Sequence, residues 1–388
     1  MAKIKRYGNI YPKIYDMDNL KLAHKRAKKD KSYYKEVKKV DENPEHYFKQ
    51  IQEMLKNKTY SVKQSDYRMM KKNDNGKERT LFVLDYFPHR IIQHALMIQV
   101  EDIIFKNLID NTFSSLPTRG IHKTSKKLKN DLLNDEENTQ QCLQMDIKKY
   151  YPHVNHEINK KQYRRIFKDD DLLWLIDMII DSLCLDDKGE LSKLIYAVEE
   201  RHGLAIGSLF SQWDGNLNLS EFDHWIKEEK KVKYYYRYCD DLIILSSSKE
   251  ELHELRKEIQ QYLKDNLKLD LKENYKIYPV DKQGIDFVGY RHFRKYTLLR
   301  KSIAKSLIRT MRDIQNKIDN GGEFDHHDYC SINGYKGWLR WCNGHNLYVK
   351  WIEPLMPYYN EYERSLKNEN ISKHKKHSRI CAYHRSKY

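Results

Sequence analysis

The stretch Tyr234–Ser246 (YYYRYCDDLIILS) places two adjacent carboxylates between two strand-like segments, and it limits the possible folds more than any other stretch. Tyrosine favours strands, and Leu242–Leu245 is an apolar run of the length of a buried strand. Aspartate disfavours strand interiors and favours turns, so we predict a β-hairpin with its tip at Cys239-Asp240. Carboxylates held at such a tip repel each other and lose hydration unless a cation lies beside them or the turn faces water.

A second stretch, Gln141–His156, supplies one further carboxylate. Cys142–Met145 has the character of a short strand that ends at Asp146, and Pro152 prevents a long helix directly after it. A strand that delivers one aspartate and a hairpin that delivers two can place three carboxylates around a pair of Mg²⁺ ions, which prefer hard oxygen ligands. A two-metal site of this kind activates a 3′-hydroxyl group and stabilises a leaving pyrophosphate.

In this order, the two stretches resemble the palm motifs of a bacterial reverse transcriptase. Tyr238-Cys239-Asp240-Asp241 matches the Tyr-x-Asp-Asp box of the family, and Asp146–Tyr151 (DIKKYY) matches its first palm motif. The resemblance implies an α+β fold, the right-hand polymerase with fingers, a ferredoxin-like antiparallel palm and a helical thumb. It also implies RNA-templated DNA synthesis with two Mg²⁺ ions held by Asp146, Asp240 and Asp241 and by the backbone of Ile147.

The composition agrees with a nucleic-acid partner. Lys and Arg number 72 against 56 Asp and Glu, and a formal charge of +16 favours a polyanion, nucleic acid before membrane. No apolar run reaches membrane-spanning length, and the 6 cysteines form no CxxC pair, so we expect a reduced, cytoplasmic chain without a zinc site. The resemblance adds template RNA, the DNA product and dNTPs as partners, together with a non-coding RNA or a small accessory protein.

Residues 77–105 resemble the fingers of the same family. By that resemblance Arg79 reaches the triphosphate of the incoming nucleotide, since a guanidinium group suits phosphate oxygens. The alternative is a surface arginine on an edge strand. Arg90 also falls on the family's pattern, either as a template contact or as a structural ion-pair partner. Arg119, in the basic turn of the 112–122 motif, would contact the template.

Four palm residues resemble the family's nucleotide pocket. Tyr151 would lie under the sugar and exclude a 2′-hydroxyl group, or would serve as a core aromatic residue. Ile206 and Gly207 stand where many reverse transcriptases have Gln-Gly, and the Ile-Gly variant resembles the enzymes of diversity-generating retroelements, in which the missing glutamine is linked to errors at template adenines. Lys272 lies near a family lysine proposed to protonate pyrophosphate.

The C-terminal third resembles the primer grip and the thumb. Gly284–Arg291 (GIDFVGYR) is similar to the primer-grip turn, and Ile332–Leu347 is similar to the thumb of the same bacterial group. The residues that would hold nucleic acid there are Phe287, Gly289 and Tyr290 in the turn and Lys336 and Arg340 in the thumb.

We therefore expect a basic N-terminal segment (1–45), fingers (46–140), a palm (141–291) with a charged insertion at 186–202, a helical thumb (292–372) and a basic tail (373–388). The N-terminal segment is either an arm on phosphates or a solvated helix. Apolar spacing predicts helices at Lys25–Lys39, His46–Lys58, Ile91–Phe105, Lys123–Leu133, Phe167–Leu185, Ser211–Glu229, Lys249–Asn266 and Leu299–Ile318. It predicts further strands at Tyr60–Met70 and Leu267–Tyr278.

Three biological roles stay open at this point. The first is mutagenic retrohoming in a diversity-generating retroelement, which the Ile206 variant favours. The second is antiphage defence, with protective or repetitive DNA made from a dedicated non-coding RNA. Trp213-Asp214-Gly215, which departs from the apolar residues expected there, and the 186–202 insertion favour this role. The third is a catalytically silent RNA-binding scaffold, against which the intact aspartate trio argues.

Overall fold

The computed structural model describes residues 5–74, 77–186, 188–192 and 200–368. The predicted basic tail (373–388) and residues 187 and 193–199 of the predicted insertion lie outside the described residues. The chain forms two compact units, the first made of Met1–Gly120 with Gln141–Tyr278 and the second of Ile121–Gln140 with Pro279–Tyr388. The division into fingers, palm and thumb cuts the chain at other places and stays a prediction. Within the described residues no helix has the length and apolar character to cross a membrane.

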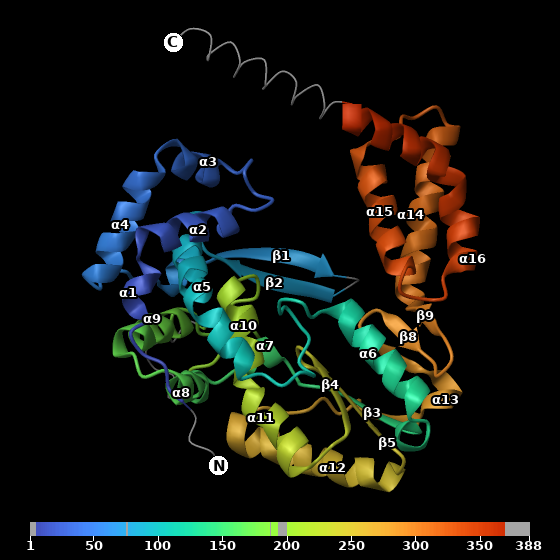
Figure 1. Ribbon diagram of the computed structural model, residues 1–388, viewed down its shortest axis with the longest axis horizontal. Coiled ribbons are helices and arrows are strands. Elements are labelled where there is room, and N and C mark those ends of the chain that lie inside the picture. The colour runs from blue at the N-terminus through green and yellow to red at the C-terminus, as the bar shows by residue number, and fades with distance from the viewer. Residues whose placement is uncertain (1–4, 75–76, 187, 193–199, 369–388) are drawn as a thin grey trace. The chain divides into compact units, whose positions relative to one another are not determined.

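The first unit begins with helices packed around α5 (Ile91–Lys106), as Figure 1 shows. α5 buries residues on all its sides along its first half, which is typical of a central helix. Of the first four helices, α1 (Tyr11–Ile14) and α2 (Met17–Ala27) pack against α5, whereas α4 (Pro44–Lys56) packs against α2 and α3 (Lys35–Glu42) packs against α4. The single basic helix predicted for Lys25–Lys39 is wrong, because the chain turns between α2 and α3 with Asp30 in a left-handed conformation (φ 59°).

A two-stranded antiparallel ribbon, β1 (Arg68–Asp74) with β2 (Lys77–Val83), precedes α5 and the π-helical turn η2 (Tyr86–Arg90). The strand predicted for Tyr60–Met70 begins only at Arg68. Tyr60 and Val62 instead enter the hydrophobic core, and the short 3₁₀ helix η1 (Gln64–Asp66) separates them from the ribbon.

The central sheet of the first unit has the strand order β4-β5-β3-β6. In it β5 pairs antiparallel with β4 on one side and with β3 on the other. Its strands are β3 (Gln141–Asp146), β4 (Tyr234–Tyr238), β5 (Asp241–Ser246) and β6 (Lys276–Pro279). α12 (Lys249–Tyr262), continued by η5 (Leu263–Leu267), packs against β3 and β5. The strand predicted for Leu267–Tyr278 is wrong over most of its length, because a turn at residues 273–274 leaves only β6 as a strand.

The remaining helices of this unit are α7 (Tyr150–His153), α8 (His156–Ile166), α9 (Asp170–Asp181), α10 (Leu209–Asn218), α11 (Ser220–His224) and η4 (Trp225–Glu229). α9 is shorter than the predicted helix Phe167–Leu185, since Asp169 caps its start by accepting a hydrogen bond from the Leu172 amide. The predicted helix Ser211–Glu229 is interrupted at Leu219, where α10 ends and α11 begins.

The second unit contains a three-stranded antiparallel sheet with helices on it (Figure 1). Its elements are α6 (Ile121–Asn134), η3 (Glu137–Thr139), α13 (Val280–Gln283), β7 (Ile285–Phe287), β8 (Tyr290–His292), β9 (Thr297–Leu299), α14 (Lys301–Asp319), α15 (His326–Leu339), α16 (His345–Leu347), η6 (Tyr348–Ile352) and η7 (Glu353–Leu355). α6 packs against β8, and α14 packs against α15. The predicted helices Lys123–Leu133 and Leu299–Ile318 correspond to α6 and α14 within two residues at each end.

Candidate active site

The predicted hairpin is present, and its tip is Cys239-Asp240. Cys239 is in the left-handed conformation (φ 58°), which closes the connection between β4 and β5 in two residues. In the antiparallel register Asp241 lies opposite Asp146 at the end of β3, and the amide of Ile147 donates to the carbonyl of Asp240 at 3.2 Å. The fold therefore brings Asp146 to the same end of the sheet as Asp240 and Asp241, which lie almost a hundred residues later in the sequence.

The pKa values of Asp240 and Asp241 are both raised at this end of the sheet. Loss of hydration and then the Asp240 and Asp146 carboxylates raise the pKa of Asp241 to about 7. Partial burial and then Asp146 raise the pKa of Asp240. Asp241 stays exposed to solvent at the end of its strand, whereas Asp146 and Asp240 are half-buried. Carboxylates that lie this close together repel one another when they are ionised, and a divalent cation between them offsets that repulsion. Their accessible oxygen atoms are the hard ligands that Mg²⁺ prefers.

Lys272 lies at this same end of the sheet. Its Nζ atom is 2.5 Å from Oδ1 of Asp146, and its backbone amide donates to the Asp146 carbonyl at 2.9 Å. The Lys272 ammonium group lowers the pKa of Asp240 and of Asp241, against the larger effects that raise them. A lysine is therefore placed beside the aspartates, while its role toward pyrophosphate stays a prediction.

An aromatic layer lies next to the hairpin tip. Tyr151 accepts a hydrogen bond from the Cys239 thiol at 3.8 Å, and Tyr150 donates to the carbonyl of Gly215 at 2.5 Å. A Cβ atom on Gly215 would lie 3.4 Å from the Tyr150 ring and 3.6 Å from the Tyr151 hydroxyl group, which is ordinary van der Waals contact. The two tyrosine rings therefore do not explain why a glycine stands at position 215 of the unexpected Trp213-Asp214-Gly215 sequence.

The other two residues of that sequence are also packed inside the first unit. Trp213 belongs to the hydrophobic core, and Asp214 is fully buried. The amide of Asn159 donates to Oδ2 of Asp214 at 2.8 Å. Burial raises the pKa of Asp214 to about 7, although the Asn159 hydrogen bond acts against it.

The loop at Ile206 and Gly207 lies beside the β1–β2 ribbon. The Phe82 amide donates to the carbonyl of Ile206 at 3.0 Å, and Gly207 has a positive φ of 110°. Arg79 is exposed on β2, opposite Lys72 in the ribbon. The structure thus brings the predicted nucleotide-binding loop next to the strand that carries Arg79, and the roles of these residues stay predictions.

Two other arginines hold the backbone of the first unit. Arg119 has 4% of its side chain exposed, and its Nη1 donates to the carbonyls of Ile109 and Thr112 at 2.6 and 2.8 Å. Arg90 is half-buried, donates from Nε to the Ala27 carbonyl at 3.3 Å, and has its pKa lowered by burial. These contacts show that both arginines stabilise the backbone of the first unit, so neither is included in the proposed nucleic-acid surface.

In the second unit, the predicted primer-grip turn joins β7 to β8. Phe287 and Tyr290 are buried, and Gly289 (φ 87°) lies so close to the Trp338 ring that a Cβ atom would approach it to 2.6 Å. Only the backbone of this turn is therefore suited to touch a primer. Lys336 lies over the Tyr359 ring at 4.1 Å.

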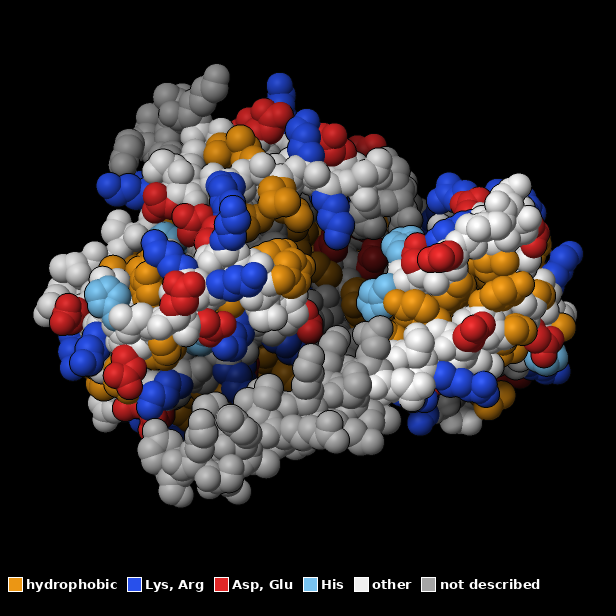
Figure 2. All heavy atoms as spheres, turned by 90° about the horizontal axis from the view of Figure 1, so that it is seen from above, with side chains coloured by type: hydrophobic (Ala, Val, Ile, Leu, Met, Phe, Trp, Pro, Cys, Tyr) orange, Lys and Arg blue, Asp and Glu red, His pale blue; other side chains and the backbone are white. Residues whose placement is uncertain are grey.

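Further side chains in this unit are exposed. Arg340 follows α15 and faces solvent, as does the neighbouring Trp341, which stacks on His122 with ring centroids 4.7 Å apart. On the face drawn in Figure 2, Lys and Arg side chains are mixed with Asp and Glu, so the net charge of +16 is not gathered into one patch on that face.

One further set of candidate metal ligands exists among the described residues. Asp325, His327 and Asp328 lie with their ligand atoms within 4.8 Å of one another at the first turn of α15. Asp325 and Asp328 form a capping box there and pair with Lys317. Helix capping explains this group without an ion.

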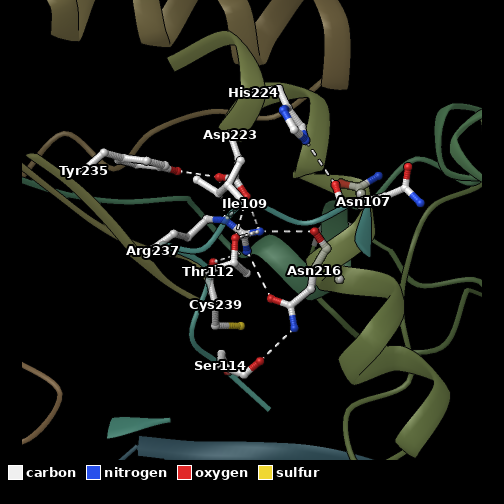
Figure 3. Close-up of polar contacts among 12 residues, drawn as sticks. Asn107, Ile109, Thr112, Ser114, Asn216, Asp223, His224, Tyr235, Arg237 and Cys239 are labelled. Atoms are coloured by element: carbon white, nitrogen blue, oxygen red, sulfur yellow. Dashed lines mark hydrogen bonds and ion pairs between the residues drawn. The ribbon is translucent and has the colours of Figure 1, made fainter. Parts of the chain in front are cut away.

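Sequence reasoning missed one residue close to the aspartates. Arg237 is completely buried in β4 and forms an ion pair with Asp223 of α11 (Figure 3). The available signal was an arginine between strand-forming tyrosines, a position where a charge must be either exposed or paired.

In the described part of the chain Cys142, Cys184, Cys239, Cys330 and Cys342 are free, and the reduced state stays a prediction.

Comparisons with known proteins agree with the site. The model of the family described as "Reverse transcriptase (RNA-dependent DNA polymerase)" matches residues 69–292, which is more than half of the chain. Protein YkfC of Escherichia coli K12 is 24% identical over 261 residues, covering 59% of this chain and 66% of that protein. The chain is thus matched to less than two thirds of the length of this relative.

Solved structures of telomerases are also similar. The structure from Candida tropicalis with a fragment of telomeric RNA has a TM-score of 0.44 at 12% identity, covering 84% of this chain and 58% of that one. The Candida albicans structure, likewise with telomeric RNA, has a TM-score of 0.43 at 11% identity, covering 64% and 50%.

The described residues form a mixed α+β fold in which an antiparallel sheet carries the three aspartates at one end, as the sequence predicts. With a family match that spans both aspartate elements and the hairpin between β7 and β8, the chain belongs to the reverse transcriptase family, whose members are RNA-dependent DNA polymerases.

Proposed function

We propose that this chain is an RNA-directed DNA polymerase that adds dNTPs to a primer 3′ end by two-metal catalysis. The observation that carries the proposal is the convergence of Asp146, Asp240 and Asp241 at one end of the sheet, with the pKa of Asp241 raised to about 7. These side chains, with the backbone carbonyl of Ile147, would hold two Mg²⁺ ions. When bound, such ions activate the primer 3′-hydroxyl group and stabilise the charge on the leaving pyrophosphate.

The other residues would bind, select and protonate. Arg79 would bind the triphosphate, and Ile206 with Gly207 would contact the new base pair from their loop. Tyr151 would lie under the sugar and exclude a 2′-hydroxyl group, so the substrate would be a dNTP. Lys272 would give a proton to the leaving pyrophosphate, which its position beside Asp146 supports.

Template RNA, the growing DNA and a dedicated non-coding RNA or accessory protein are the partners we propose, in the cytoplasm. The backbone of the Gly289 turn, with Lys336 and Arg340, would hold the product duplex. Mutagenic retrohoming in a diversity-generating retroelement is the first candidate role, supported by Ile206 in place of a glutamine. Antiphage defence is the second, supported by the charged segment 186–202. The Trp213-Asp214-Gly215 departure from the expected apolar residues also favours it, with Trp213 and Asp214 buried in the first unit.

Sequencing the nucleic acid that co-purifies with the protein from its native locus tests activity and role together, with Asp240→Ala as the control. We expect DNA copies of an RNA in the wild-type sample and none with the variant. Copies with scattered changes at template adenines support retrohoming, whereas repetitive DNA or copies of one small RNA support defence. RNA alone in both samples would contradict the proposal and favour a silent scaffold.

A further inference from the structure

The buried ion pair between Arg237 and Asp223 is linked by a hydrogen bond to the tip of the aspartate hairpin. Arg237 and Asp223 are both fully buried, and Figure 3 shows the guanidinium at the centre of a group of polar contacts. Burial alone would lower the pKa of Arg237, but the Asp223 carboxylate outweighs it and raises that pKa, so the guanidinium is charged. Tyr235 donates to Oδ1 of Asp223 at 2.6 Å, and Thr112 donates to Oδ2 at 3.0 Å.

Each nitrogen of the Arg237 guanidinium has acceptors. Nε donates to the two oxygens of Asp223 at 2.8 and 3.0 Å, and Nη2 donates to Oδ2 of Asp223 at 2.5 Å and to the Asn216 carbonyl at 3.1 Å. Nη1 donates to Oδ1 of Asn216 at 3.3 Å and to the carbonyl of Cys239 at 3.2 Å. The planar fork of arginine is what allows one side chain to reach α10, α11 and the hairpin at once.

The contact with Cys239 bears directly on Asp240. The Cys239 carbonyl belongs to the peptide group that joins Cys239 to Asp240, at a turn where Cys239 has a φ of 58° that L-residues rarely adopt. On the other side of Asp240, its own carbonyl accepts from the Ile147 amide at 3.2 Å. Both peptide groups that flank Asp240 are therefore anchored, one by Arg237 and one by β3.

Stability of the fold does not by itself require this arrangement. A buried ion pair loses hydration that its attraction only partly restores, and apolar residues of similar volume often serve stability equally well. An apolar side chain cannot, however, donate to the Cys239 carbonyl. The backbone of Arg237 is held as well, since its amide donates to the Asn111 carbonyl at 3.0 Å and its carbonyl accepts from the Phe113 amide at 3.1 Å.

We propose that Arg237 is a positioning residue for polymerisation, which orients the Cys239–Asp240 peptide and thereby aims the Asp240 carboxylate toward Asp146. The inference rests on the proposed function, because it assigns Asp240 to the catalytic site. Asp223 and Asn216 hold the guanidinium in place. Arg237 acts through Asp240 and touches no substrate.

Arg237→Lys tests the proposal, because lysine keeps the charge beside Asp223 but has no fork to reach Cys239 as well. We expect the kcat of primer extension to fall about 10- to 100-fold, since small misplacements of catalytic groups have effects of this size. We expect the KM for dNTP to stay within about twofold, since no substrate contact is lost. In metal-free buffer, hydrogen exchange should become faster for the Ile147 amide and the hairpin tip but stay unchanged in the second unit.

Arg294→Lys is the matched control. Arg294 is another buried arginine with several partners, Asp281, Thr139 and the Leu132 carbonyl among them, but it belongs to the second unit, whereas Asp240 belongs to the first. Wild-type kcat and wild-type exchange at Ile147 in Arg237→Lys would overturn the proposal, and so would an equal loss of kcat in the control.

If Arg237→Lys does not fold, Asn216→Ala is measured instead. This change removes one acceptor of the guanidinium and should lower kcat about 3- to 10-fold with the same local increase in exchange. Wild-type kcat and exchange in Asn216→Ala would then overturn the proposal. An inactive wild-type chain, or an active Asp240→Ala variant, would refute the proposed function itself. These outcomes differ from those that would refute only the positioning role of Arg237.

Discussion

Asp214 is predicted to weaken the folded state as the pH rises, so that Asp214→Asn stabilises the protein most at high pH. This carboxyl group is fully buried, and burial raises its pKa from 3.8 to about 7. A folded-state pKa above the unfolded value means that the folded chain binds the proton more tightly. Stability is then highest with the proton bound and falls as the pH rises between the two pKa values.

The magnitude follows from the shift. One pKa unit corresponds to about 1.4 kcal/mol, so the raised pKa of Asp214 makes the folded state less stable, relative to low pH, by roughly 4 kcal/mol at pH 8 and roughly 2 kcal/mol at pH 5. Asparagine keeps the acceptor for Asn159, and its amide nitrogen would face the Tyr163 hydroxyl group, which lies beside Asp214 without a well-formed hydrogen bond. We therefore expect a gain of about 2–4 kcal/mol at pH 8 that is about 2–3 kcal/mol smaller at pH 5.

Urea-induced unfolding followed by circular dichroism, at both pH values and with EDTA present, measures the gain. Asp265→Asn, at an exposed carboxylate that accepts from the nearby Gln261 side chain, is the control and should behave alike at the two pH values. The reasoning is refuted if Asp214→Asn lowers the free energy of unfolding by the same amount at pH 5 and pH 8. That result would mean that the carboxylate is charged and well solvated or paired in the folded chain.

Further predictions concern the chemistry of the site. Lys272→Met should lower kcat by about 10- to 100-fold in single-turnover extension, because it removes a proton donor; an unchanged rate would exclude that role. Tyr151→Val should raise rNTP incorporation relative to dNTP by about tenfold or more in competition assays, and unchanged selectivity would assign Tyr151 to packing alone. Ile206→Gln should lower misincorporation opposite template adenines in sequenced products, and an unchanged error spectrum would count against the retroelement interpretation.

The aspartate trio could be predicted because its signals are local. The alternation from tyrosines to two aspartates to an apolar run specifies a hairpin, and β3 ends at Asp146 where its apolar residues end. The register that sets Asp146 opposite Asp241 follows once both strands bury one face against α12. Beyond their own residues, these two elements need little more than a helix that packs against that face.

Other features depend on contacts that a single sequence does not display. Arg119 and Arg237 look like solvent-exposed charges, yet their partners are backbone carbonyls and an aspartate on a separate helix. Leu267–Tyr278 alternates like a strand, but only its last residues find a partner strand in β3. Pattern shows which side chains prefer burial, whereas pairing is decided by tertiary structure.

Primer extension on a defined RNA template tests the central claim most directly. The purified chain, each of the variants Asp146→Ala, Asp240→Ala and Asp241→Ala, and Asp265→Ala as a surface control are given dNTPs and Mg²⁺, and RNA binding is measured in parallel. We predict that the wild type and the surface control extend the primer. Each variant of the aspartate trio should bind RNA normally but extend the primer at least about 10³-fold more slowly. Extension by Asp240→Ala at the wild-type rate would contradict the account.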